Sequence, residues 1–170
     1  MNGRTILVSL TLLTLGSCAP APKGHAGLPW TAQVVDAATG QPVQGVVVLA
    51  YWIKYTASFG GWGGSEFYDS QEVVTGPDGR YAIQPRPSYT LPGVNKVSAE
   101  ILIFKPGYGR WAYRSARGEE VVIELPPLKT REERLKFYGS LRWSGRVPSE
   151  RTQRLREAVQ MERAYLGFRN

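Results

Sequence analysis

Few side chains in this chain of 170 residues could do chemistry on their own. It has one cysteine, Cys18, and one histidine, His25. A thiolate metal site needs several Cys or His ligands, and a serine or cysteine nucleophile needs a positioned base to activate it. His25 lies in a stretch rich in Ala, Pro and Gly, so we interpret it as a solvated linker residue. We therefore expect no metal, no cofactor and no histidine-assisted nucleophile.

The carboxylates offer another route to catalysis. A hydrolase built on Glu66, Asp69 and Glu72 would have to work without histidine or metal. Asp36 and Asp78 each stand beside a turn containing glycine, where a short carboxylate accepts backbone amide hydrogens. We interpret these two residues as structural. The sequence thus predicts a protein that is not an enzyme.

The N-terminal segment gives the cysteine a more specific context. Arg4 supplies a positive charge, an apolar run follows from Ile6 to Leu15, and Leu15-Gly16-Ser17-Cys18 ends it with small residues. This is the architecture of a signal peptide, because about ten apolar residues are too few for a transmembrane helix of about 20. An ordinary secretory signal with a chance cysteine is the alternative interpretation.

The last four residues of that segment resemble a bacterial lipobox. The resemblance implies that Cys18 becomes the first mature residue and carries the acyl chains. Ala19, which is not acidic, implies the outer membrane as the destination in a Gram-negative cell, and we expect the protein to face the periplasm. We expect a protein of the bacterial cell envelope that is anchored to membrane lipid through acylated Cys18.

Composition divides the chain further. From Ala19 to Leu128 nine Lys/Arg balance nine Asp/Glu, whereas from Lys129 to Asn170 eleven stand against five, so the net charge of +7 resides mainly in the C-terminal part. The segments predicted are 1–17, a signal peptide; 18–28, a flexible tether; 29–127, a β-sandwich; and 128–170, a basic helical extension. No nucleic-acid-binding motif surrounds the arginines, and an exported protein does not meet nucleic acid, so we expect none as a partner.

The segment 29–127 is predicted to be mainly β. Runs rich in β-branched and aromatic residues are separated by turn residues, and no helical period lies between them. The apolar run from Val46 to Ile53 indicates a buried strand. This spacing predicts an antiparallel β-sandwich. The expected strands are Trp30–Asp36, Gln44–Tyr55, Phe67–Thr75, Arg80–Gln84, Val97–Phe104, Tyr108–Tyr113 and Glu120–Leu125.

Three blocks of this segment resemble the carboxypeptidase regulatory-like domain. They are Val35-Asp36 with Thr39 to Val46, then Val74 to Tyr81, then Phe104 to Tyr108. The blocks follow the order expected for the family and cover nearly the whole segment. The resemblance implies a seven-stranded antiparallel Greek-key β-sandwich of the transthyretin-like (prealbumin-like) type. It also implies a non-catalytic unit, because the zinc and catalytic residues of the carboxypeptidases belong to a different domain.

Aromatic residues crowd into the middle of the segment, around a glycine-rich stretch from Ser58 to Ser65 that we expect to be a loop. Aromatic rings on an exposed loop can stack on sugars or anchor a protein partner. Trp62, Phe59 and Tyr55 are therefore candidate contacts for a ligand or partner. The alternative is that aromatic side chains fill the sandwich core, which we expect of Tyr51, Trp52, Phe67 and Tyr68.

The basic extension is predicted to contain two helices. Thr130 followed by Glu133 fits a capping box and indicates a short helix over Arg131–Tyr138. A second helix, from Arg151 to about Leu166, is amphipathic. It could fold back on the sandwich, dock a partner, or lie on anionic lipid headgroups. Its apolar stripe, interrupted by Glu162, comprises Leu155, Ala158, Val159, Tyr165 and Leu166; its candidate basic contact face comprises Arg151, Arg154 and Arg156.

These features together predict a membrane-anchored envelope lipoprotein. Its non-catalytic β-sandwich is expected to act as a structural or protein-binding module, with an envelope protein as the partner. The alternative is a carbohydrate-binding surface lipoprotein that binds a glycan with the loop aromatics.

Overall fold

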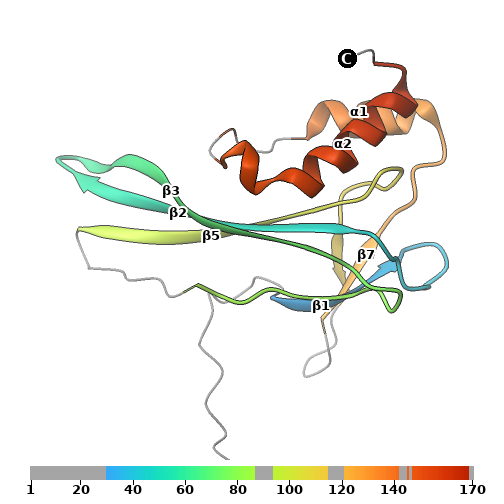
Figure 1. Ribbon diagram of the computed structural model, residues 1–170, viewed down its shortest axis with the longest axis horizontal. Coiled ribbons are helices and arrows are strands. Elements are labelled where there is room, and N and C mark those ends of the chain that lie inside the picture. Colours follow the sequence, from blue (N-terminus) through green and yellow to red (C-terminus); the bar gives the residue numbers. More distant parts are fainter. Residues whose placement is uncertain (1–29, 87–93, 115–120, 142–144, 146, 169–170) are drawn as a thin grey trace, which may run out of the picture.

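The computed structural model describes residues 30–86, 94–114, 121–141, 145 and 147–168. The predicted signal peptide and tether, with Cys18 and His25, lie outside these ranges. Within them the chain is mainly β, with two sheets and two α-helices (Figure 1).

The strands form one sheet with the order β4-β1-β7-β6 and another with the order β3-β2-β5. All strand pairs are antiparallel except β1 and β7, which run parallel from Gln33 opposite Val122 to Asp36 opposite Leu125. The expectation of an entirely antiparallel arrangement is wrong at this pair, because β7 returns to β1 after the other strands instead of through a hairpin. The strands are β1 (Thr31–Asp36), β2 (Val47–Ser58), β3 (Gly61–Val74), β4 (Arg80–Ala82), β5 (Asn95–Phe104), β6 (Ala112–Arg114) and β7 (Val122–Leu125).

The C-terminal part forms α1 (Arg131–Ser140), a 3-10 turn η1 (Ser149–Arg151) and α2 (Gln153–Leu166). The predicted capping box is confirmed. The Glu133 amide donates to Thr130 Oγ1 over 3.1 Å, and the Thr130 amide donates to Glu133 Oε2 over 3.1 Å. In the described part of the chain, no helix combines the length and apolar character needed to cross a membrane.

Strand β2 is buried on both faces, which explains its long apolar run. Successive side chains of a strand point to opposite faces, so such a run needs a partner on each side. One set packs in a core shared with the four-stranded sheet, and the other packs beneath the helices (Figure 1). The first set is Val48, Ala50 and Trp52, joined by Val46 just before the strand; the second is Val47, Leu49, Tyr51 and Ile53.

Helix α2 folds back on the β3-β2-β5 sheet, one of the three arrangements left open by its sequence. Leu155, Ala158 and Val159 are buried against β2 and Phe104. Tyr165, expected on the buried stripe, is instead 56% exposed. Its ring faces the guanidinium group of Arg134, 3.4 Å from the ring centroid, which provides a cation–π contact at the surface.

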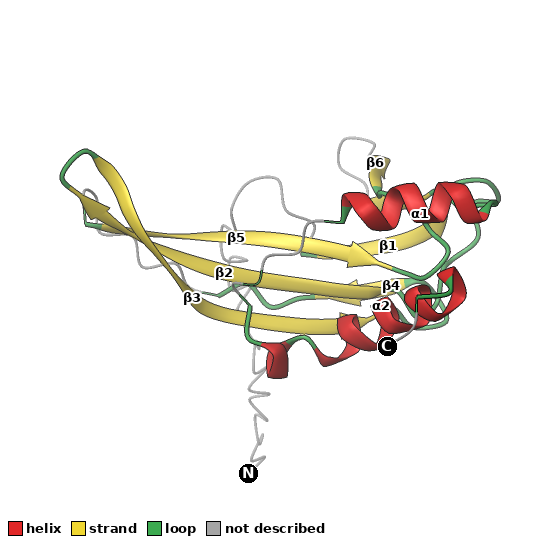
Figure 2. Cartoon of the chain, turned by 90° about the horizontal axis from the view of Figure 1, so that it is seen from above, coloured by secondary structure: helices red, strands yellow, loops and turns green. Residues whose placement is uncertain are grey.

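The β2–β3 hairpin extends beyond the rest of the fold (Figures 1 and 2). The expectation of a loop from Ser58 to Ser65 is wrong, because β2 continues to Ser58 and β3 starts at Gly61. Gly60 and Gly61 have φ angles of 108° and 139°, a region that glycine adopts at little cost, and so they close a tight turn. We call residues 54–67 the hairpin arm.

The pairing of β3 with β2 is irregular at two points. Trp52 pairs with Asp69 and Ile53 pairs with Phe67, so Tyr68 is an extra residue in a bulge. Tyr68 was expected in the core but is 41% exposed, because the bulge removes it from the regular alternation. A second irregularity lies between Thr56 and Ala57, within the hairpin arm.

Candidate functional site

The hairpin arm carries the three aromatic residues that the sequence singled out. Trp62 is 47% exposed, Phe59 in the turn is fully exposed and Tyr55 is half-buried. Tyr55 lies opposite Lys96 of β5 in the strand register. The Lys96 Nζ lies 4.7 Å from the centroid of the Trp62 ring and 5.4 Å from that of Tyr55. The structure thus brings Tyr55 and Trp62 together around one ammonium group, with Phe59 standing apart at the tip.

The tip of the arm is apolar and carries no charge. No charged residue occurs from Tyr55 to Ser65, and the Lys54–Glu66 pair, with Nζ and Oε1 2.7 Å apart, marks the inner limit. Val94, which is 53% exposed, lies beside it and accepts a hydrogen bond from the Ala57 amide. Sequence reasoning missed Lys96 and Val94. The predicted strand began only at Val97, so the register that brings these residues to the arm was not visible.

The candidate basic residues lie at the start of the α2 region. Arg151 is in η1, Arg154 and Arg156 are in α2, and all three are exposed. Two positions along an α-helix correspond to about 200° of rotation, so Arg154 and Arg156 project from different sides. A partner that contacts all three arginines would therefore have to wrap around the start of α2.

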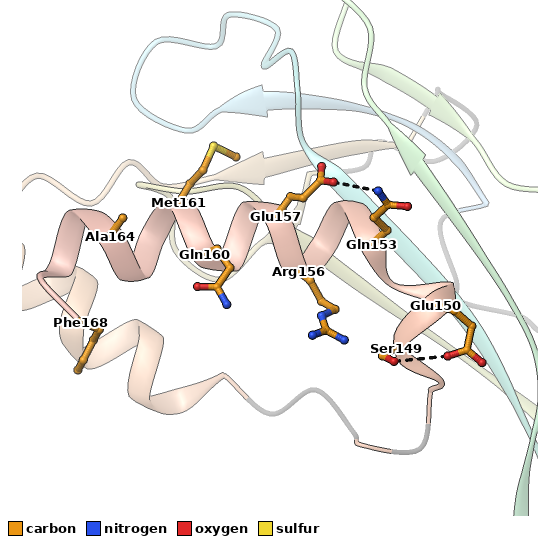
Figure 3. A pocket seen from close by; sticks show the side chains of 9 residues that line it. All are labelled: Ser149, Glu150, Gln153, Arg156, Glu157, Gln160, Met161, Ala164 and Phe168. Carbon is orange, nitrogen blue, oxygen red and sulfur yellow. Dashed lines mark hydrogen bonds between the residues drawn. The ribbon is translucent and has the colours of Figure 1, made fainter. Parts of the chain in front are cut away.

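The outward face of α2 is a wide, shallow depression of about 940 Å³ (Figure 3). It mixes Arg156 with the acidic residues Glu150 and Glu157. Two hydrogen bonds lie within this face: Gln153 Nε2 donates to Glu157 Oε1 over 3.2 Å, and the Ser149 hydroxyl donates to Glu150 Oε2 over 3.4 Å. Mixed charge and a nearly flat shape give this face no chemistry that selects one ligand.

Glu72 has a structural partner far away in the sequence. The N-cap residue of α2, Thr152, makes no side-chain capping hydrogen bond. The Glu72 carboxylate takes that role, accepting from the amides of Arg154 over 3.0 Å and Leu155 over 2.9 Å. A carboxylate at this position satisfies free amides and interacts favourably with the positive end of the helix dipole.

The other acidic candidates bind separate partners. Asp69 accepts from Arg86 Nε over 2.6 Å, and Glu66 binds Lys54 on the arm. Glu66, Asp69 and Glu72 are therefore directed to three different groups and do not converge. The described residues include no cluster of three or more His, Cys, Asp or Glu side chains arranged to hold a metal ion.

Asp36 accepts the backbone hydrogens expected of it. Its Oδ1 binds the amides of Ala38 over 2.8 Å and Thr39 over 3.0 Å, and its Oδ2 binds the Tyr108 hydroxyl over 3.1 Å. Burial acts to raise the pKa of Asp36, but these hydrogen bonds together outweigh it and hold the pKa below its ordinary value. This carboxylate fixes the turn between β1 and β2.

Glu162, which interrupts the apolar stripe of α2, forms a buried two-pronged ion pair with Arg134 of α1. The nitrogen–oxygen distances are 2.7 Å from Nε to Oε1 and 2.5 Å from Nη2 to Oε2. The Gly107 amide also donates to Glu162 Oε2 over 2.9 Å. The hydrogen bond to Glu162 raises the pKa of Arg134, so this guanidinium stays charged.

A groove of about 660 Å³ opens beside β5, between that strand, the start of β6 and the end of α1. Nothing in the sequence marked it, because its walls come from three separate parts of the chain. Most of its lining is apolar: Ile101, Leu102, Ile103, Trp111, Phe137 and Leu141.

No protein-family model, no curated protein and no solved structure matches this chain.

Proposed function

We propose that this protein is a membrane-anchored lipoprotein of the bacterial envelope that binds a protein partner through its hairpin arm. The lipobox-like residues Leu15 to Cys18 support the anchor. The projection of the arm, at one end of the β3-β2-β5 sheet, beyond the four-stranded sheet and the helices supports the binding role (Figure 2). The β-rich body then serves as a non-catalytic support that holds the arm away from it.

The fold proposed for this body is a transthyretin-like Greek-key β-sandwich similar to the carboxypeptidase regulatory-like domain. Two sheets that share one apolar core support it. The three blocks that carry the resemblance fall at the turn from β1 to β2, the turn from β3 to β4, and the end of β5. Each block is a turn region, so the resemblance concerns how strands are connected.

The observation that carries the proposal is the exposure of Phe59 and Trp62 at the end of a hairpin whose strands are paired almost to the turn. Burying an aromatic side chain removes about 150–250 Å² from water, and such residues dominate many interfaces. The arm is paired through its backbone as far as Ser58 and Gly61, so little ordering is needed on binding. An apolar pocket on a partner protein is the complement of such a tip.

Glycan binding by the same rings is the alternative function. A sugar stacks on the open face of an aromatic ring. Lys96 already covers one face of Tyr55 and of Trp62. A protein partner needs only apolar area at the tip, so the geometry favours a protein over a glycan.

The test uses full-length protein, extracted in detergent after crosslinking in cells. Partners that co-purify with the unchanged chain are quantified against Trp62→Ala, Phe59→Ala and a control, Met161→Ala, an exposed apolar residue on α2. We expect the arm variants to lower the recovery of the same partner at least about tenfold and the control to leave it unchanged. Unchanged recovery in both arm variants would refute the proposal. If the unchanged chain binds a glycan array and the arm variants do not, the alternative is supported.

The anchor is tested separately by mass spectrometry of the mature N-terminus. We expect an acylated Cys18 as the first residue. A mature chain that begins elsewhere or carries no acyl chain would refute the anchoring while leaving the role of the arm untouched.

A further inference from the structure

The two edges of the β3-β2-β5 sheet differ in character. β3 is interrupted by two irregularities, whereas β5 pairs with β2 in unbroken register from Asn95 opposite Thr56 to Phe104 opposite Val47. No described strand other than β2 pairs with β5. Every second residue of such an edge strand directs its N–H and C=O away from the sheet. Bulges and prolines commonly guard exposed edges, and β5 has neither.

The last four residues of β5, Ile101–Phe104, are the better acceptor. The only charged residues of the strand, Lys96 and Glu100, both precede Ile101. Lys96 is held over the aromatic rings of the arm, and Glu100 accepts a hydrogen bond from the Tyr51 hydroxyl. Ile101–Phe104 therefore combines free backbone groups on its outer side with uncharged side chains.

The groove described above lies beside this uncharged end of β5. Ile101 and Ile103 form one wall, Trp111 contributes from the segment before β6, and Phe137 and Leu141 contribute from the α1 side. Its volume of about 660 Å³ lies within the range of about 300–1,000 Å³ typical of sites that hold apolar groups. Arg110 also lines it and is exposed, so a cation lies at its rim.

We propose that β5 accepts an extended segment of a partner protein as an added strand, with alternate apolar side chains of that segment seated in the groove. An acidic side chain or terminal carboxylate of the segment would face Arg110. A small apolar ligand would fill the groove but leave the outer backbone groups of β5 without partners, whereas a strand satisfies both. This surface lies towards the end of β5 away from the hairpin arm and is independent of it.

A second copy of this chain fits the groove less well. Ile103 is 2% exposed and Val97 5% exposed, because these β5 side chains point into the core of their own molecule. Two copies could pair their β5 edges, but neither could then place those side chains in the groove of the other. A separate segment with free side chains is the better complement.

The experiment selects displayed random peptides of about ten residues on the full-length protein in detergent micelles. Ala112→Trp serves for counter-selection, because Ala112 lines the groove from an exposed position on β6 and the larger ring would fill it. Gln160→Trp, exposed on α2, is the matched control. We expect enriched peptides to carry alternate apolar residues and an acidic residue. Ala112→Trp should weaken their binding at least about tenfold, and Gln160→Trp and Trp62→Ala should leave it unchanged.

Backbone pairing is tested with two N-methylated versions of an enriched peptide. One carries methyl groups on the odd amides and the other on the even amides, so both keep every side chain. Only alternate N–H groups of a strand face its neighbour, so one pattern should weaken binding at least about tenfold and the other should have little effect. The amides of Ile101–Phe104 should also exchange more slowly with solvent when the peptide is bound.

Three results would overturn the proposal. The first is that no peptide is enriched over the counter-selection. The second is that both N-methylated versions bind as well as the parent, which would mean that side chains alone are recognised. The third is a dimer in sedimentation velocity that Ala112→Trp dissociates, which would assign the edge to a second copy of the chain.

Discussion

Glu162 shows how one residue can break a periodic pattern without disturbing the helix that contains it. It stands on the apolar stripe of α2, with a side chain only 4% exposed. A buried carboxylate is tolerated only when it is paired and hydrogen-bonded. Arg134 and the Gly107 amide provide this, so one carboxylate connects α1, α2 and the turn after β5.

Removing one partner of this pair should be costly. Glu162→Ala leaves the Arg134 guanidinium partly buried without its anion, and we expect the free energy of unfolding to fall by about 3–5 kcal/mol. Urea denaturation measures this change. The double variant Glu162→Leu with Arg134→Leu should recover most of the loss, because it removes both charges together. A double variant no more stable than the single one would show that the charges themselves stabilise the fold.

Asp36 should make the free energy of unfolding depend on pH. Its folded-state pKa lies below the ordinary value near 3.8. Its contribution is therefore fully present above that value and is lost as the pH falls through the folded-state pKa. Urea unfolding between about pH 2 and 6 should show a steeper acid loss in the parent than in Asp36→Asn. Asp78→Asn, at an exposed turn, is the control, and identical profiles for parent and Asp36→Asn would contradict the assignment.

At the scale of the elements, α2 depends on a cap that its own sequence does not supply. Glu72→Ala removes the acceptor for the amides of Arg154 and Leu155, and we expect a loss of about 1 kcal/mol in the free energy of unfolding. Hydrogen exchange should report faster exchange in the first turn of α2. Glu66→Ala, which breaks the exposed pair with Lys54, should change stability by less than about 0.5 kcal/mol. Equal effects of the two substitutions would argue against the capping role.

The elements that the sequence predicted well are those with local signals. The capping box at Thr130 and the buried strand that contains Val47–Ile53 each follow from neighbouring residues. The errors arise from contacts between distant residues. The glycines from Gly60 to Gly64 suggested a loop. Pairing with β2 instead makes this stretch part of β3, which starts at Gly61. Tyr165 fits the apolar period, but the partner that holds it at the surface is Arg134 on another helix.

The residues of the candidate site also fall into those with a local signal in the sequence and those that depend on contacts between distant residues. Trp62 and Phe59 could be named from their types and from the glycines around them. Glycines on either side indicate a turn at the surface, where an aromatic ring is available for contacts. Lys96 could not, because a cation–π contact requires the register between β2 and β5. The groove beside β5 was also invisible, since the residues lining it share no local pattern.

At the scale of the whole molecule, the chain forms three layers in which the β3-β2-β5 sheet lies between the other sheet and the helices (Figure 1). The net charge changes near Leu128, but apolar contacts join the segments on the two sides of that position. The outer face of β2 is covered by Leu155, Ala158 and Val159. The basic segment thus turns most of its apolar stripe inward and leaves Arg151, Arg154 and Arg156 outside.

A chain that ends at Leu128 should therefore lose more than its positive charge. It would expose Val47, Leu49 and Ile53, each now at most 5% exposed, together with the neighbouring Phe104. An apolar sheet face of this kind associates with other surfaces, so we expect increased binding of an apolar dye and concentration-dependent oligomers in sedimentation velocity. Replacing Arg151, Arg154 and Arg156 with Ser removes charge but keeps the packing, and this variant should sediment like the parent. A truncated chain that stayed monomeric and bound no more dye would show that the helices are an appendage and not part of the core.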